Sequence, residues 1–399
     1  MEKRDMFSID GYVQWLKKEL TSLYMNNFIR GIAFSLVGIF IPIYLLTLNF
    51  SLSEVFSYFL VFHIATFIFT PLSLIFSRRI GYKPIFISSI FFMILFFALL
   101  YSLENYSIPI YLIALILGIQ ESFYFTPLHV FFTKHSEDLK RGEQVSHYTS
   151  WGILAGLIGP VLGGFIAVLF GFKMLFSIGI LFLVASIFPL IKLENIKSDT
   201  KISFFGVKKL IKENKKFFLA LGANDTRSEV EGIIWPIFTF IVLENIISVG
   251  WVGTIVSAGT ILFTLFLGRH YDTKNKFFFL KIGGILYALI WALRIFSDSQ
   301  LSIYALSLGA GFFGLMIAVP FNAMFYDKSS EKEKPDEFII VKEIPTFVAR
   351  SLLWILMILL ANKFIIAFIL AGLSSLFFAI ISIFGFEPLI RRSERNKNG

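Results

Sequence analysis

Twelve apolar stretches run through this chain of 399 residues, separated by polar segments. About 20 predominantly apolar residues let a helix cross the hydrocarbon core of a bilayer, and each stretch is close to that length or longer. In lipid, a helix satisfies every backbone N–H and C=O group internally. The sequence therefore predicts an all-α membrane protein whose twelve transmembrane helices cover residues 22–48, 53–76, 84–103, 107–131, 146–169, 173–192, 217–243, 247–268, 277–297, 300–325, 338–361 and 364–386.

The composition agrees with a membrane location. Apolar residues make up 56% of the chain and charged residues 16%, which excludes an ordinary soluble domain. The chain has no cysteine, so disulfides, thiol catalysis and cysteine-ligated metals are excluded. The net charge of +9 comes from basic residues in the loops and flanks, and membrane topology explains them better than a nucleic-acid partner does.

The second half of the chain repeats landmarks of the first half. Pro42 recurs as Pro236 at a separation of 194, and four landmarks recur at 193 (for example 320 − 127), namely Ile110, Tyr111, Gly118 and Pro127 as Ile303, Tyr304, Gly311 and Pro320. Shared apolar composition alone does not produce one constant spacing. We therefore expect two pseudo-symmetric six-helix bundles, residues 1–197 with a cytoplasmic N-terminal lead-in and residues 217–399, joined by a basic linker at 198–216.

Positive charge predicts the orientation of the chain in the membrane. Lys and Arg gather in alternate loops and in both terminal segments, so the positive-inside rule places both termini in the cytoplasm, and we expect the plasma membrane. Within the linker, Val207, Leu210 and Ile211 alternate with lysines. This pattern suits a segment lying on an anionic leaflet, and a plain solvated linker is the alternative.

Two loops resemble a sequence signature of the major facilitator superfamily. The segment Ser73-Leu-Ile-Phe-Ser-Arg-Arg-Ile-Gly-Tyr-Lys83 resembles its Gly-x-x-x-Asp-Arg-x-Gly-Arg-Lys loop, and Gly268-Arg-His-Tyr-Asp-Thr-Lys-Asn-Lys276 occupies the matching place in the second half. In the family this loop latches helices at the cytoplasmic gate. The resemblance implies a gate formed by Ser77, Arg78, Arg79, Gly81, Lys83, Gly268, Asp272 and Lys274, although serines replace the glycine and the aspartate of the first loop.

The fifth span carries a glycine pattern that looks like the Gly-Pro-x-x-Gly-Gly helix of family exporters. Its residues are Gly156, Gly159, Pro160, Gly163 and Gly164. Glycines three to four residues apart let a second helix approach closely, and proline bends the helix. In the family this pattern accompanies proton-driven antiport, and simple close packing is the alternative explanation.

Ionisable side chains within spans are costly, by at least about 2.5 kcal/mol each on insertion scales, and so by default they have a function. The seventh span holds the densest group, Asn224, Asp225, Arg227, Glu229 and Glu231. At 100° per residue, Asp225 and Glu229 share one face, while Arg227 and Glu231 share a nearly opposite one. We expect Asp225 and Glu229 to face the cavity and Arg227 to form an internal ion pair with Glu231.

Other polar residues within the spans complete the predicted site. The resemblance implies that spans one, four, seven and ten line the cavity, so that Glu121 faces Glu229 across the two halves. Arg30 would either bind an anionic substrate group or neutralise Glu121. In the eleventh span Arg350 is expected to pair with Glu343, one heptad earlier, and Arg294 in the ninth to snorkel towards the interface. The predicted substrate cavity is lined by Asn27, Arg30, His63, Gln120, Tyr124 and Asn224.

These features predict a secondary active transporter that moves a small solute by alternating access. We expect proton coupling through Asp225, Glu229, Glu231 and Glu121, with efflux favoured over uptake. The chain shows no nucleotide-binding loop, metal-spaced histidines or nucleophile–base arrangement, so we expect neither an enzyme nor a cofactor or metal site. Expected partners are the solute, protons and membrane lipids, with no nucleic acid, and the chain is expected to be a monomer. The alternative is a transporter-like sensor or lipid-handling protein without ion-coupled flux.

Overall fold

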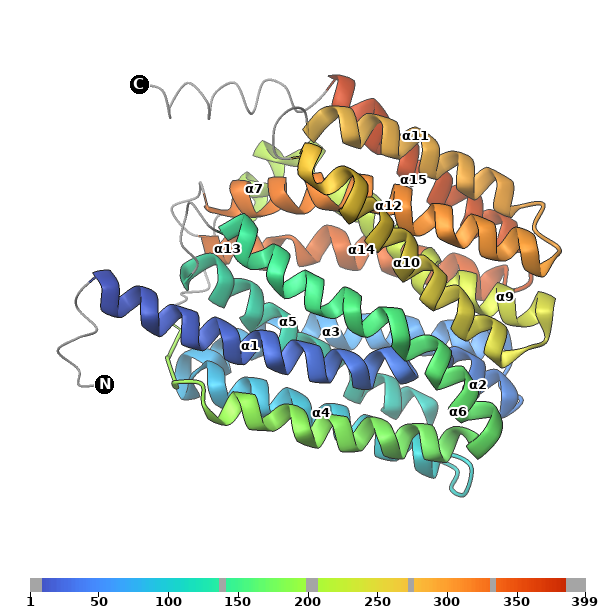
Figure 1. Ribbon diagram of the computed structural model, residues 1–399, viewed down its shortest axis with the longest axis horizontal. Coiled ribbons are helices and arrows are strands. Elements are labelled where there is room, and N and C mark those ends of the chain that lie inside the picture. Colours follow the sequence, from blue (N-terminus) through green and yellow to red (C-terminus); the bar gives the residue numbers. More distant parts are fainter. Residues whose placement is uncertain (1–8, 136–140, 199–206, 272–275, 331–334, 385–399) are drawn as a thin grey trace. The chain divides into compact units, whose positions relative to one another are not determined.

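The computed structural model describes residues 9–135, 141–198, 207–271, 276–330 and 335–384 (Figure 1). Within these ranges every regular element is a helix and no strand occurs. The first part of the chain forms α1 (Ile9–Val37), α2 (Ile41–Thr47), α3 (Leu52–Ile80), α4 (Tyr82–Ser102), α5 (Ile110–His135) and α6 (Arg141–Ile191). The all-α prediction is confirmed.

The second part of the chain begins with a short helix and contains one interrupted span. Its helices are α7 (Val207–Glu213), α8 (Lys215–Glu229), α9 (Trp235–Leu243), α10 (Ile246–Tyr271), α11 (Lys276–Arg294), α12 (Gln300–Ser330), α13 (Pro335–Val341), α14 (Glu343–Leu359) and α15 (Phe364–Phe384). A π-helical turn, Val230–Ile234, joins α8 to α9. The amphipathic segment of the predicted linker is thus helical, as α7.

Nine helices of the described residues are long and apolar enough to cross a membrane. This number is smaller than the twelve predicted spans because four of the predicted spans do not each form one separate long helix. Spans five and six form the single element α6, which bends at Gly171, where φ is 82°. The seventh span is divided among α8, the π-helical turn and α9, and the eleventh, α14, is 17 residues long.

The chain forms two compact units whose boundaries differ from a simple division at the linker. Unit 1 comprises Met1–Gly38, Tyr58–Ser203 and Ser329–Ile340, and unit 2 comprises Ile39–Ser57, Phe204–Lys328 and Val341–Gly399. The N-terminal end of α3 belongs to unit 2, where the Ser53 hydroxyl donates to the carbonyl of Ile358 (3.3 Å) and the Phe56 ring lies 5.8 Å from that of Trp354. The predicted pair of six-helix bundles stays a prediction.

Unit 1 is built around the packing of α1 against α6 and of α4 against α5 and α6 (Figure 1). Small residues allow the first of these contacts. A Cβ atom added at Gly159 would collide with Ser35, and one added at Gly31 would lie 3.3 Å from the Ala155 Cβ. The Ser35 hydroxyl also donates to the carbonyl of Ala155 (2.9 Å). Part of the fifth-span glycine pattern therefore serves close helix packing.

Unit 2 is built around the packing of α11 against α15 (Figure 1). In the same unit α8 packs against α14 and α15. Gly284 of α11 lies where an added Cβ would come within 2.7 Å of the Ser375 carbonyl. Trp235, Trp291 and Trp354 are fully buried in this unit. α8, which carries Asp225, Arg227 and Glu229, thus packs against α14 and α15.

One helix contact recurs in both units at positions related by the sequence repeat. A Cβ added at Gly118 of α5 would lie 2.7 Å from the Phe62 carbonyl and 2.8 Å from the Thr66 nitrogen of α3. A Cβ added at Gly311 of α12 would likewise meet the carbonyl oxygen of Val256 and the backbone nitrogen of Thr260 in α10. The partner positions are 194 residues apart (256 − 62 and 260 − 66). The repeat thus extends from sequence landmarks to backbone packing.

Candidate functional site

The seventh span presents its charged residues on two faces, and each face contacts a different helix. Asp225 and Glu229 contact α14, whereas Glu231 contacts α11. This is the division expected from 100° per residue along one helix. The π-helical turn follows Glu229 directly, and in it the Trp235 N–H donates to the carbonyl of Val230, five residues earlier.

On the first face two carboxylates share one guanidinium. Arg350 donates from Nη2 to Asp225 Oδ1 (2.9 Å), and its Nε lies 3.1 Å from Glu229 Oε1. The Thr346 hydroxyl donates to the other oxygen of Asp225 (2.7 Å). The three charged side chains are largely buried, with exposures of 21% for Arg350, 14% for Asp225 and 9% for Glu229. We refer to Asp225, Glu229, Thr346 and Arg350 as the α8–α14 ion cluster.

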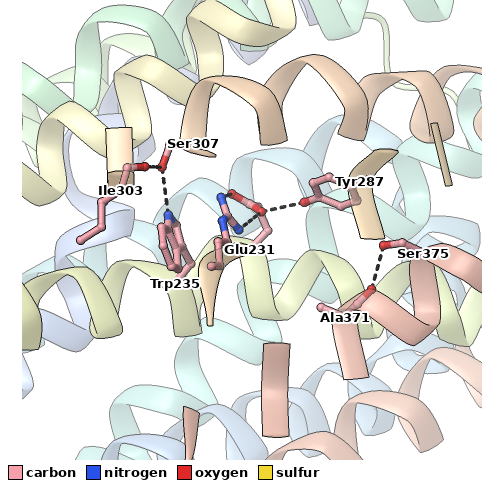
Figure 2. Close-up of polar contacts among 8 residues, drawn as sticks. Glu231, Trp235, Tyr287, Ile303, Ser307, Ala371 and Ser375 are labelled. Carbon is pink, nitrogen blue, oxygen red and sulfur yellow. Dashed lines mark hydrogen bonds and ion pairs between the residues drawn. The ribbon is translucent and has the colours of Figure 1, made fainter. Parts of the chain in front are cut away.

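On the second face Glu231 is held by α11. Arg294 donates from Nη1 to Oε2 (2.6 Å) and from Nη2 to Oε1 (2.9 Å), and the Tyr287 hydroxyl donates to Oε2 (2.6 Å; Figure 2). The Arg294 guanidinium lies 4.0 Å from the Trp235 ring and 4.3 Å from the Trp291 ring. Trp235 is itself fixed by donation from its Nε1 to the Ser307 hydroxyl (3.0 Å; Figure 2).

Arg227 lies on this second face but does not pair with a carboxylate there. Its Nη2 donates to Asn224 Oδ1 (2.8 Å), and its guanidinium lies 5.2 Å from the Tyr287 ring centroid. The predicted pairing of Arg227 with Glu231 is therefore wrong. The bidentate fork of Arg294 matches the carboxylate better than a neighbour on the same helix can.

Two other expected contacts differ in the structure. Arg350 was expected to pair with Glu343 but turns to α8, while Glu343 lies 3.5 Å from the amine of Lys342. The two carboxylates of α8 offer Arg350 a hydrogen-bonded site inside the bundle. Arg294 does not snorkel, because its side chain is fully buried and paired with Glu231.

The polar residues of unit 1 gather between α1 and α5. Tyr124 is fully buried, and its hydroxyl donates to Asn26 Oδ1 (2.9 Å). Asn26 in turn donates to the carbonyl of Ser186 (2.8 Å). The Arg30 guanidinium lies over the Tyr124 ring, 3.9 Å from its centroid.

The remaining predicted residues of unit 1 have different exposures. Asn27, His63 and Gln120 are buried, with 8%, 3% and 1% of their surface exposed, and Glu121 is half-buried. The His63 ring lies 4.5 Å from that of Phe62. Gln120 and Tyr124 are four residues apart on α5 and so share a face of that helix.

The first predicted gate loop is tied to the chain that follows α6. Arg78 and Arg79 are exposed, whereas Ser77 is buried and its carbonyl accepts from the Ser198 N–H (3.2 Å). Gly81 has a φ of 98°, and an added Cβ there would collide with Asn195.

Further hydrogen bonds extend this contact within unit 1. The Tyr82 N–H donates to the carbonyl of Ile196 (2.9 Å), and Lys83 Nζ donates to that of Ile191. In the second loop Gly268 belongs to α10, while Asp272 and Lys274 lie outside the described residues.

The glycine pattern of the fifth span lies within α6. Gly163 and Gly164 are buried, and Pro160 lies inside the helix. Gly159 packs on Ser35 of α1, as described above. Gly156 belongs to the same helix.

The sequence alone did not point to two contributors to these clusters, Tyr287 and Thr346. Tyr287 and Arg294 are seven residues apart on α11, and Thr346 and Arg350 are four apart on α14. Each pair shares one helix face, which is a signal present in the sequence. The partner of each face was not evident, because it lies on another helix.

The comparisons with known proteins decide the family. The model of the Major Facilitator Superfamily matches residues 23–228, just over half of the chain. The chain belongs to the major facilitator superfamily. No curated protein matches the chain in sequence.

A solved transporter structure shows the same fold. The crystal structure of the human organic anion transporter MFSD10 (TETRAN) superposes with a TM-score of 0.67 at 12% sequence identity, covering 92% of this chain and 99% of that one. At this identity the likeness establishes the fold alone. Membership of the major facilitator superfamily makes the chain an integral, multi-pass membrane protein of a transporter family, as the loops and spans predicted.

Proposed function

We propose that this member of the superfamily is a proton-coupled secondary transporter that moves a small solute by alternating access. The α8–α14 ion cluster carries this proposal. Its two carboxylates and one guanidinium leave one excess negative charge when all three groups are ionised. A proton on one carboxylate removes that excess, and burial makes the proton's presence depend on access of water.

The exposure of the seventh span supports this assignment. Ser228 and Gly232 are exposed, although most of their neighbours are buried or half-buried. A Cβ added at Gly232 would meet nothing within 4 Å. These two positions flank Glu229, and we propose that water reaches the cluster along this part of the helix. Glu121 in unit 1 is retained as a further proton carrier.

Glu231 is reassigned from proton carrier to structural contact within this proposal. Its two oxygens receive three hydrogen bonds from Arg294 and Tyr287. These matched donors fix the carboxylate in its contact with α11. The proton carriers that we propose are accordingly Asp225, Glu229 and Glu121.

The proposal also includes the direction of transport and the location of the protein. The fifth-span glycines resemble those of exporters, and on that resemblance we favour efflux by proton antiport. The basic loops favour cytoplasmic termini in a plasma membrane. The predicted substrate residues are Asn27, Arg30, His63, Gln120, Tyr124 and Asn224.

Transport in proteoliposomes tests the coupling. A panel of labelled small solutes is screened for accumulation driven by an imposed pH gradient and for exchange in the absence of a gradient. We expect Asp225→Asn, Glu229→Gln and Glu121→Gln to lose gradient-driven accumulation while exchange of the same solute continues. Full accumulation by the Asp225 and Glu229 variants would refute the assignment.

The matched control replaces an acid outside the cluster. Glu104 is paired with Lys173 (3.1 Å), and both side chains are about one-third exposed, at 33% and 34%. Glu104→Gln should leave both accumulation and exchange unchanged. Solute binding without flux in any condition would instead favour the sensor alternative.

A further inference from the structure

Unit 1 contains a buried arginine whose contacts are aromatic rings. Arg30 is 6% exposed, and its guanidinium lies 3.9 Å from the Tyr124 centroid and 5.1 Å from that of Phe125. Its Nε atom has no hydrogen-bond partner among the described residues. By contrast, Arg294 and Arg350 in unit 2 each form an ion pair with a carboxylate.

A second buried donor lies on the same helix as these rings. The Nε2 of Gln120 is buried and has no hydrogen-bond partner in the described part of the chain. Gln120 precedes Tyr124 by four residues, so both lie on one face of α5. A buried donor left unsatisfied costs about 1–3 kcal/mol, and more if it is charged. Both open positions are N–H donors, so they match an acceptor.

The Tyr124 ring is fixed in place by other contacts. Its hydroxyl donates to Asn26 (2.9 Å), and the Asn26 amide donates to the carbonyl of Ser186 on α6 (2.8 Å). The ring is thereby a rigid support for the Arg30 guanidinium. An arginine stacked on a ring keeps its planar edge available for a carboxylate.

We propose that Arg30 and Gln120 bind the carboxylate of an organic anion, which is the solute carried by this protein. The cation supplies the charge, and the two open N–H groups supply hydrogen bonds to an acceptor. The rings beside the guanidinium favour an anion with an apolar or aromatic body over a strongly hydrated inorganic anion. This inference rests on the proposed transport function and names the class of its substrate.

Thermal unfolding of the purified protein in detergent tests the site without requiring flux. The probes are benzoate, 2-naphthoate and octanoate, each beside its carboxamide, together with inorganic phosphate. Stabilisation of the folded state by a ligand raises Tm with ligand concentration. We expect at least one carboxylate to raise Tm, and its carboxamide and phosphate to have little effect.

Variants connect the shift to the two residues. Arg30→Gln should abolish the shift. Arg30→Lys keeps the charge but lacks the planar fork, so binding should weaken roughly tenfold, as for the loss of one hydrogen bond to a charged group. Gln120→Leu should weaken binding by a similar factor. Arg227→Gln removes a buried arginine beside a ring in unit 2 and should leave the shift intact.

The outcomes separate this inference from the transport proposal. Equal shifts with carboxylates and carboxamides, no shift with any carboxylate, or an unchanged shift in folded Arg30→Lys and Gln120→Leu would overturn the inference. A larger effect of phosphate would also overturn it. Proton-driven accumulation of a neutral solute would then leave the transport proposal standing. Carboxylate binding without any flux would support the site and contradict transport.

Discussion

At the residue scale, three arginines in unit 2 differ in what surrounds them. Arg294 has a bidentate carboxylate and two indole rings, Arg350 serves two carboxylates, and Arg227 has an amide and a phenol ring. In the first arrangement the single positive charge of Arg294 is balanced by the single negative charge of Glu231. The second leaves a carboxylate in excess, and on this imbalance rests the proposal that the α8–α14 ion cluster binds a proton.

The structural pair leads to a stability prediction. Breaking a buried ion pair by removing one partner typically costs about 3–5 kcal/mol, because the other charge stays buried. Arg294→Met and Glu231→Leu should therefore each lower the Tm of the detergent-solubilised protein by many degrees. The double variant should recover much of the loss, because it leaves no unpaired charge.

An exposed ion pair is the control for this measurement. Lys173→Met disrupts the contact with Glu104, and surface pairs contribute about 0–1 kcal/mol. Its Tm should therefore change little. If Arg294→Met were as stable as Lys173→Met, the structural role of the buried pair would be disproved.

At the element scale, the spans depart from regular helices at positions with local causes. Gly171 adopts a positive φ between the fifth and sixth spans, a conformation that glycine enters without steric cost. In the seventh span the Trp235 N–H bonds five residues back. Pro236 follows directly and has no N–H to offer to the carbonyl of Gly232. The widened turn lies directly after Glu229, beside the α8–α14 ion cluster.

The repeated glycine contacts give an element-scale prediction. Gly118→Ala and Gly311→Ala both place a methyl group against backbone atoms of the neighbouring helix. Overpacking of this kind costs about 1–3 kcal/mol, so both variants should lower Tm by comparable amounts. Because the contact recurs in the two halves, a large loss in one variant and none in the other would argue against equivalent packing.

Gly152→Ala provides a control on α6. A Cβ added there would lie 3.8 Å from the side-chain nitrogen Nδ2 of Asn27, which is ordinary van der Waals contact. Alanine is also the better helix former, by about 1 kcal/mol. Its Tm should stay the same or rise slightly.

At the scale of the whole molecule, the absence of cysteine makes the membrane topology directly measurable. Single cysteines introduced by Asn105→Cys and Lys363→Cys lie in loops expected outside the cell. Those introduced by Arg79→Cys and Lys212→Cys lie in segments expected in the cytoplasm. With a membrane-impermeant maleimide, intact cells should label the first two variants, and the other two only after permeabilisation.

The positive-inside rule is the physical reason for this expectation. Lys212 and Arg79 are exposed in the structure, so the reagent can reach them once the membrane is opened. Labelling of Arg79→Cys in intact cells would show that the chain has the opposite orientation in the membrane. The cysteine-free parent chain measures background labelling.

The sequence by itself determined the apolar spans, the break near Gly171 and the two faces of the seventh span. These follow from the lengths of apolar runs and from 100° per residue, which are properties of one helix. Only the tertiary structure decided which arginine meets which carboxylate. Arg294 lies 63 residues from Glu231 in sequence, and Arg350 lies 125 from Asp225. The physical reason is that such pairs depend on which helix faces pack together, and glycine contacts and side-chain volumes throughout each unit determine that packing.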